Sequence, residues 1–188
     1  MTIQFTNTSL KGCKYGHLNT FIDTRGEFTK VFQLSEITKH FSEFEVAESY
    51  LTKSQPGVLR GMHLQLPPDD HEKIVICLQG HILDVVLDLR NGEDYGSHDS
   101  IALSANSQNV IIVPKGVAHG FYAHEAATLL YLVSTEHAPK NDKGIKWDSF
   151  GCHWPIRNPI LSERDTTFPA LQDFKTPFTE SDRCTTSK

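Results

Sequence analysis

A cluster of residues in the middle of the chain has the spacing of a metal site but lacks several expected ligands. Gly57 is followed at the appropriate distance by His63, and a Pro-x-Gly-x-x-His sequence ends at His119. The second histidine of the usual His-x-His pair is replaced by Gln65, and Lys73 stands where a glutamate ligand is expected. A fixed positive charge there disfavours a metal ion and can instead stabilise a developing negative charge. The pattern therefore predicts enolate chemistry without a metal.

The elements that carry these residues are predicted to be short β-strands. Apolar and polar residues alternate over 83–90, which is the period of a half-buried strand. A partner strand is expected over 73–78, with Gln79 and Gly80 forming a hairpin turn between the two. Further apolar runs predict strands over 110–113, 120–123 and 128–134. Closely spaced short strands favour a barrel or a sandwich.

One helix is predicted ahead of these strands. Ser35 is a suitable N-cap residue, and Ile37, Phe41 and Phe44 recur at helical spacing after it. We expect this helix to cover one end of the barrel.

Composition limits the classes of protein and partner. The 188 residues carry a formal net charge of −5 and no cluster of lysine and arginine, which argues against a nucleic-acid partner. The four cysteines lack Cys-x-x-Cys spacing, and no signal peptide or long apolar run is present, which together predict a cytoplasmic protein without a membrane segment. We predict a single domain over 1–175 and a polar C-terminal tail over 176–188.

Six segments together resemble the nucleotide-sugar 3,5-epimerase family, typified by dTDP-4-dehydrorhamnose 3,5-epimerase, within the cupin superfamily. The segments are Arg-Gly-Met-His-Leu-Gln at 60–65, Lys-Ile-Val at 73–75, and those at 84–90, 114–121, 144–147 and 159–165. The resemblance implies an all-β fold, a cupin-type double-stranded β-helix or jelly-roll barrel with a few short peripheral helices. It also implies a homodimer that needs no metal or cofactor and acts on a nucleoside-diphosphate 4-keto-6-deoxy sugar.

The resemblance implies catalytic roles for four residues, and their chemistry suits those roles. A hydrogen beside the C4 ketone is acidic because its conjugate base is an enolate, so the site needs a base, a donor for the enolate oxygen and an acid on the opposite face. His63 is the implied base, with Asp165 accepting its other ring proton. Lys73 would face the enolate oxygen, and Tyr131 would return a proton. Residue types leave open whether C3, C5 or both are inverted.

Substrate binding is implied for a second group of residues. Arg25 and Arg60 match family arginines that hold the diphosphate, a task suited to forked guanidinium groups. Phe28 lies in the segment whose aromatic rings stack on the base, and both Arg25 and Phe28 are expected to reach across from the partner subunit. Gln65 and His119 are expected to contact the substrate from the barrel, although His119 is equally explained as a hydrogen-bonded structural histidine.

Four further substrate-binding candidates depart from the family pattern. Lys30 replaces a glutamate, Glu48 and Tyr50 replace the ends of a Gln-x-Asn sequence, and His137 replaces a second tyrosine. A lysine can donate to N3 or O2 of cytosine and a glutamate can accept from its amino group, so we hypothesise a CDP-sugar, such as a CDP-linked 3,6-dideoxy-4-keto hexose inverted at C5. A dTDP-sugar is the alternative. Solvent-facing charge changes would equally explain Lys30 and Glu48.

Two other functional classes remain open from the sequence. One is a metal-dependent cupin with His63 and His119 as ligands, which Lys73 disfavours. The other is a non-catalytic binder of sugar nucleotides, which would not need an acid and a base on opposite faces. Taken alone, Tyr131 is equally explained as a core residue, Asp165 as a loop or capping residue, and the charged segment 69–72 as a solvated loop.

Overall fold

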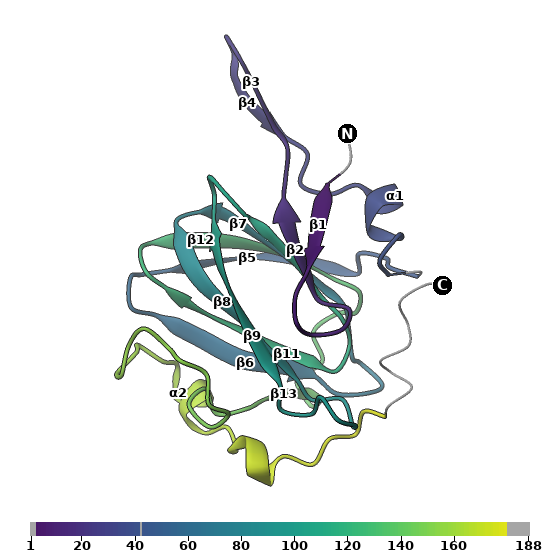
Figure 1. Ribbon diagram of the computed structural model, residues 1–188, viewed down its shortest axis with the longest axis vertical. Coiled ribbons are helices and arrows are strands. Elements are labelled where there is room, and N and C mark those ends of the chain that lie inside the picture. Colours follow the sequence, from purple (N-terminus) through teal and green to yellow (C-terminus); the bar gives the residue numbers. More distant parts are fainter. Residues whose placement is uncertain (1–2, 42, 180–188) are drawn as a thin grey trace.

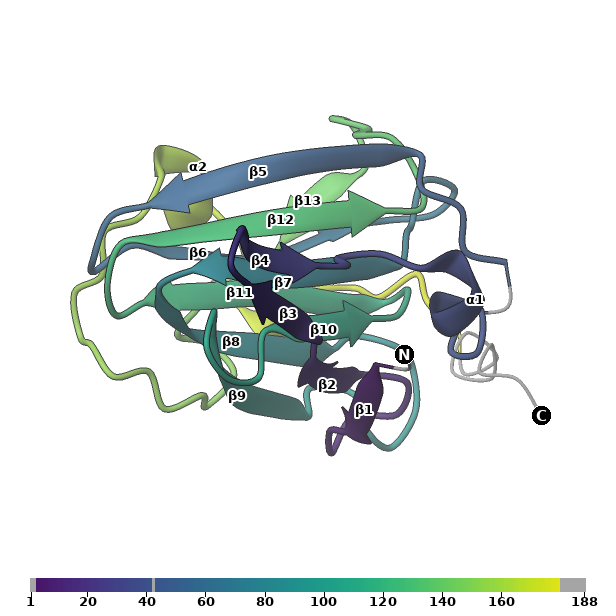
Figure 2. The same cartoon turned by 90° about the horizontal axis from the view of Figure 1, so that it is seen from above.

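The computed structural model describes residues 3–41 and 43–179, and two facing antiparallel sheets form a jelly-roll barrel (Figures 1 and 2). One sheet has the order β1-β2-β10-β7-β12-β5 and the other the order β13-β6-β11-β8-β9. The first contains β1 (Gln4–Asn7), β2 (Lys14–His17), β10 (Val110–Val113), β7 (Lys73–Gln79), β12 (Ala127–Val133) and β5 (Glu48–Ser54). The second contains β13 (Asp142–Gly144), β6 (Leu59–Gln65), β11 (Val117–Ala123), β8 (His81–Asp88) and β9 (His98–Ser104). The predicted all-β fold is confirmed.

Helices within the described residues are short and peripheral, as predicted. They are α1 (Leu34–Ile37), α2 (Glu163–Thr166) and the 3₁₀ turn η1 (Leu171–Asp173). No helix in the described part of the chain has the length and apolar character needed to span a bilayer.

The core that positions the site lies between the two sheets. Val75 and Leu129 come from the first sheet, and Val86 and Phe121 come from the second. All four are at most 1% exposed, so a dry interior separates the sheets and holds their spacing. Polar side chains that enter this interior must therefore find partners within it.

The expected hairpin between β7 and β8 is wrong. The two strands belong to different sheets, and Gly80 turns the chain from one sheet to the other with a φ of +87°. A Cβ at Gly80 would lie 2.4 Å from the carbonyl oxygen of Ala126, so the turn requires glycine. Cys77 and Ile82 flank this turn and enter the same core from opposite walls, which a direct pairing would prevent.

The expectation that β8 is half-buried is also wrong, because both of its faces are covered. Val86 faces the barrel interior, whereas Val85 and Leu87 pack beneath the C-terminal part of the chain. Ile145 and Phe150 from that part complete the outer cluster. A segment remote in sequence thus covers the outer face of β8, which the local alternation of residues predicts to be exposed to solvent.

The predicted helix forms only in part. α1 has four residues, Gln33 is its N-cap without a side-chain hydrogen bond, and Ser35 lies inside the helix rather than at its cap. Ile37, Phe41 and Phe44 are nevertheless buried and pack with the outer face of the six-stranded sheet. The apolar contacts of this segment are therefore retained although its helical spacing is not continued.

The barrel domain extends slightly beyond the predicted boundary at residue 175. Phe178 is buried against Arg90 and Gly116, and Thr176 donates a side-chain hydrogen bond to the carbonyl oxygen of Leu89. The polar tail therefore begins no earlier than residue 179, and 180–188 lie outside the described residues.

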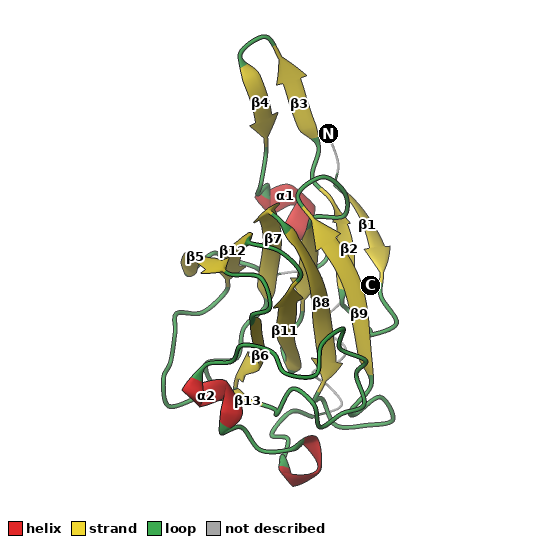
Figure 3. Cartoon of the chain, turned by 90° about the vertical axis from the view of Figure 1, so that its left-hand side faces the viewer, coloured by secondary structure: helices red, strands yellow, loops and turns green. Residues whose placement is uncertain are grey.

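A two-stranded hairpin projects from the barrel. β3 (Thr20–Asp23) and β4 (Gly26–Thr29) pair with each other and belong to neither large sheet, and Figures 1 and 3 show them extending away from the body. Its apolar side chains are exposed: Phe21 by 43%, Ile22 by 75% and Phe28 by 60%.

Candidate active site

A pocket of about 300 Å³ gathers most of the predicted barrel residues. Its walls come from β5, β6, β7, β12 and β13, with α2 at one side. The predicted residues that line it are Glu48, Tyr50, His63, Gln65, Lys73 and His137. The other lining residues are Leu64, His71, Val133, Thr135, Asp142 and Arg164.

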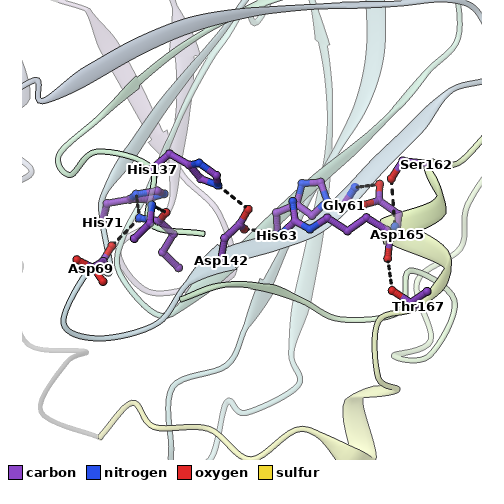
Figure 4. Close-up of polar contacts among 12 residues, drawn as sticks. Gly61, His63, Asp69, His71, His137, Asp142, Ser162, Asp165 and Thr167 are labelled. Atoms are coloured by element: carbon purple, nitrogen blue, oxygen red, sulfur yellow. Dashed lines mark hydrogen bonds and ion pairs between the residues drawn. The ribbon is translucent and has the colours of Figure 1, made fainter. Parts of the chain in front are cut away.

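His63 and Asp165 form the predicted hydrogen-bonded pair. His63 Nε2 lies 2.7 Å from Asp165 Oδ1, and Figure 4 shows the two side chains directed toward each other from β6 and α2. Ser162 caps α2 by accepting a bond from the Asp165 backbone N–H, while the backbone N–H of Gly61 donates to Asp165 Oδ2. Because Nε2 is held by the carboxylate, Nδ1 is the ring nitrogen available to act as a base.

The Asp165 carboxylate is kept ionised by its contacts. Burial alone would raise its pKa, but the hydrogen bond and charge of His63, and the Gly61 N–H, lower that pKa below its usual value. An ionised Asp165 orients the His63 ring and stabilises the imidazolium that forms when His63 accepts a proton.

Lys73 provides a buried ammonium group beside His63. Its Nζ donates to the backbone carbonyl of His63 at 3.0 Å, and the residue is only 6% exposed. Burial lowers the pKa of Lys73 to about 8, because the charged form is poorly solvated there. Lys73 is therefore mostly protonated at neutral pH and can interact strongly with a negative oxygen in the pocket.

Tyr131 lies next to the pocket, behind Tyr50. The two residues pair across β12 and β5, and their rings stack with centroids 4.7 Å apart. Burial, and then the neighbouring Tyr50, raise the pKa of Tyr131 well above 10. Tyr131 is therefore a neutral phenol that can donate a proton.

His119 lies in the barrel interior rather than in the pocket wall. Its Nε2 is 2.7 Å from Asp84 Oδ2, and both residues are buried. These contacts agree with the explanation of His119 as a hydrogen-bonded structural histidine. Its contact with substrate stays a prediction. Within the described residues no group of three or more His, Cys, Asp or Glu side chains is placed to hold a metal ion.

Gln65 holds two loops together from the pocket wall. Its amide nitrogen donates to the Asp69 carbonyl at 2.8 Å, and its oxygen accepts from the Ala138 backbone N–H at 2.6 Å. The segment 69–72 is therefore half-buried and tied to the barrel, so the expectation of a solvated loop is wrong. His71 from this segment lines the pocket, and burial, with Lys73 nearby, lowers its pKa to about 2. Local sequence gave no sign of this, since acidic residues surround His71.

His137 belongs to a charged network at the pocket rim. Its Nε2 lies 3.0 Å from Asp142 Oδ2 (Figure 4). The backbone N–H of His137 donates to the Glu48 carboxylate at 2.7 Å. Asp142 also forms an ion pair of 2.6 Å with Arg164. Asp142 and Arg164 were missed from the sequence, although Arg164 directly precedes the predicted Asp165.

The predicted nucleotide-binding residues are spread over separate places. Arg60 lies on the barrel, where its Nε donates to Ser54 Oγ at 3.0 Å. Arg25 lies at the hairpin turn, exposed and paired with Asp23 at 2.6 Å. Phe28 and Lys30 line a second pocket of about 120 Å³ at the hairpin base. Lys30 and Glu48 thus line different pockets of one chain.

These observations describe a jelly-roll protein in which a histidine–carboxylate pair, a buried lysine and a neutral phenol lie in or beside one pocket. A sequence model described as dTDP-4-dehydrorhamnose 3,5-epimerase matches residues 7–173. The chain belongs to this nucleotide-sugar epimerase family, which confirms the resemblance, and it is therefore an isomerase.

Individual relatives match between 76% and 93% of this chain. A dTDP-4-dehydrorhamnose 3,5-epimerase of Sinorhizobium fredii is 33% identical over 180 residues, covering 93% of this chain and 92% of the relative. A dTDP-4-dehydrorhamnose 3-epimerase of Streptomyces niveus is 32% identical and covers 76% of this chain and 72% of the relative. The crystal structure of an epimerase from Legionella pneumophila in complex with dTDP-4-keto-L-rhamnose superposes with a TM-score of 0.86 at 27% identity, covering 92% and 95% of the two chains.

Proposed function

We propose that this protein inverts C3, C5 or both in a dTDP-linked 4-keto-6-deoxy sugar, as a dTDP-4-dehydrorhamnose 3,5-epimerase does. The observation that carries the proposal is the His63–Asp165 pair beside the buried ammonium of Lys73 in one pocket. Relatives named as 3,5-epimerases of dTDP-4-dehydrorhamnose support the substrate class. The comparisons thus favour the dTDP alternative over the CDP hypothesis.

Proton removal is assigned to His63 and Lys73. His63 Nδ1 takes the hydrogen from a carbon next to the C4 ketone, and the C–H electron pair moves into the enolate, leaving negative charge on the C4 oxygen. The Nε2–H bond to Asp165 stabilises the resulting imidazolium. Lys73 donates to the enolate oxygen, where a shielded positive charge has its greatest effect.

Proton return is assigned to Tyr131. Its neutral phenol gives a proton to the same carbon from the opposite face, which inverts the centre, and the enolate electrons reform the ketone. The phenolate then regains a proton from solvent, and His63 loses the proton that it abstracted. The cycle needs no cofactor because no net oxidation or reduction occurs.

The CDP hypothesis finds no support in the comparisons, whose named substrates are dTDP-linked. The Glu48 carboxylate already accepts the backbone N–H of His137, and Lys30 is exposed near the hairpin. Within one chain these two residues cannot contact the same base, because they line different pockets.

The projecting hairpin supports the proposed homodimer. An isolated two-stranded hairpin with exposed Phe21, Ile22 and Phe28 is marginally stable in water, so a second copy of the chain is the proposed cover. In that arrangement Arg25 and Phe28 would reach the partner's pocket and complete its nucleotide site. The proposed chemistry and the predicted cytoplasmic location need no other partner.

Proton NMR in heavy water tests the proposed function. The protein is mixed with dTDP-4-keto-6-deoxyglucose, and the H3 and H5 signals are followed, with the CDP-linked sugar and its 3-deoxy analogue as parallel samples. Loss of H3, H5 or both with the dTDP sugar is expected. Faster loss with a CDP sugar would reverse the nucleotide assignment, and no loss with any sugar would favour the non-catalytic binder.

A further inference from the structure

Two tyrosines face the barrel interior side by side at the edge of the six-stranded sheet. β5 is the last strand of that sheet, and Tyr50 on β5 is the register partner of Tyr131 on β12. Directly opposed residues of an antiparallel pair point to the same face. The register partners Glu48 and Val133, two residues further along each strand, also point to this face, and both line the pocket.

Tyr50 lines the pocket and stacks on Tyr131. Tyr50 is 39% exposed and lines the pocket, whereas Tyr131 is 6% exposed and does not. Their rings are nearly parallel, with an interplanar angle of 10°. His119, on β11 of the facing sheet, contacts the Tyr131 ring edge to face, with the two ring centroids 6.0 Å apart. The Tyr131 ring is therefore held between two other rings.

We propose that Tyr50 is a specificity-determining residue that, by stacking on Tyr131, restricts reprotonation to one of the two carbons beside the ketone. This inference rests on the proposed function and on Tyr131 as its acid. Tyr50 acts through Tyr131 and is therefore a positioning residue.

The physical basis is the short reach of a proton donor. A phenol must approach the reacting carbon to within hydrogen-bonding distance, and misplacement by about 1 Å can cost roughly a hundredfold in rate. C3 and C5 lie on either side of C4, so a ring held in one position serves them unequally. Relatives named as 3,5-epimerases and as a 3-epimerase share this family, so the number of inverted centres varies among its members.

Deuterium exchange rates at C3 and C5 test the proposal, measured by NMR with the dTDP-linked 4-keto sugar. Wild-type protein should exchange one carbon much faster than the other. Tyr50→Ala should shrink the ratio of the two rates by about two- to tenfold, the range expected for losing one aromatic pair. Tyr50→Phe retains the ring and should retain the ratio. Leu51→Ala, an exposed change at the next residue of β5, is the matched control.

A spectroscopic readout separates positioning from a general loss of structure. Loss of the covering ring in Tyr50→Ala should expose Tyr131, so its pKa should fall toward 10 in an ultraviolet titration, with Tyr50→Phe as reference. If Tyr50→Ala does not fold, judged by its thermal unfolding, Tyr50→Leu provides the same loss of stacking.

An unchanged C3-to-C5 ratio in an active Tyr50→Ala protein would overturn the proposal alone. Equal rates in the wild type would do the same. Absence of exchange in the wild type would instead remove the proposed function, and this inference with it.

Discussion

The pocket and the projecting hairpin differ in how their functional residues are held. His63 and Lys73 in the pocket are fixed by partners from the same chain, through Asp165 and a backbone carbonyl. Arg25 and Phe28 on the hairpin are exposed, and Arg25 forms an ion pair with Asp23, two residues away. One chain therefore holds the proposed catalytic residues, whereas the proposed nucleotide site needs a second copy.

This difference separates rate from affinity. Changes in the pocket should lower turnover while leaving nucleotide affinity nearly intact. Changes in the hairpin should weaken binding and leave turnover of bound substrate intact.

The largest effect is expected for His63→Asn, which removes the base. Exchange at the sugar carbons should fall by about 10²- to 10⁴-fold, the range for general acid–base catalysis, while dTDP binding is retained. NMR exchange and calorimetry with dTDP measure the two quantities. His81→Asn, a histidine outside the pocket, is the control. Retained exchange would show that another group is the base.

Lys73→Met should have the next largest effect. Loss of the cation that faces the enolate should lower kcat by about 10²- to 10³-fold. The free energy of unfolding should not fall, because burial already opposes the charged form and methionine fills similar space. Steady-state kinetics and chemical denaturation provide the data, with the exposed Lys146→Met as control. A normal kcat would exclude Lys73 from the enolate site.

Arg25→Ala tests the proposed nucleotide-binding role of the hairpin. The KM for the sugar nucleotide should rise by about ten- to a hundredfold with little change in kcat, because one set of charge-assisted hydrogen bonds to the diphosphate is lost.

Mixing and refolding Arg25→Ala with His63→Asn provides a sharper measurement. At low substrate concentration the mixture should exceed either variant, since mixed dimers have one site in which both defects are absent. Activity that equals the average of the two variants would mean that Arg25 serves its own chain.

The smallest effect is the pH dependence set by Lys73. Only the protonated amine stabilises the enolate, and the pKa of Lys73 lies near 8, so kcat should fall by about tenfold per pH unit above pH 8. Lys73→Met should lack this alkaline decline. A wild-type profile that stays level to pH 10 would contradict the assignment.

Sequence patterns predicted single strands better than their pairing. The expected strand over 110–113 coincides with β10, and the one over 128–134 is shifted by one residue from β12. The hairpin between β7 and β8 was wrong because alternation describes one strand at a time. Whether two strands that follow each other in sequence belong to the same sheet depends on how the two sheets enclose the core.

Candidate residues follow the same division. The residue types and spacing of His63 and Lys73 placed both in one predicted pocket, where the structure has them. His71, Asp142 and Arg164 were missed because they lie in a loop, in the three-residue strand β13 and in the short helix α2, which have no distinctive local pattern.

By itself the sequence determined the all-β class, the epimerase family and the identity of the residues suited to enolate chemistry, because these depend on residue type and short spacing. The pair of Asp165 and His63, 102 positions apart, was predicted only through the family resemblance, whereas tertiary structure alone decided that Tyr50 stacks on Tyr131. It also decided that the hairpin leaves its own barrel. Such contacts arise from how sheets and loops pack around a shared core, and no local segment contains that information.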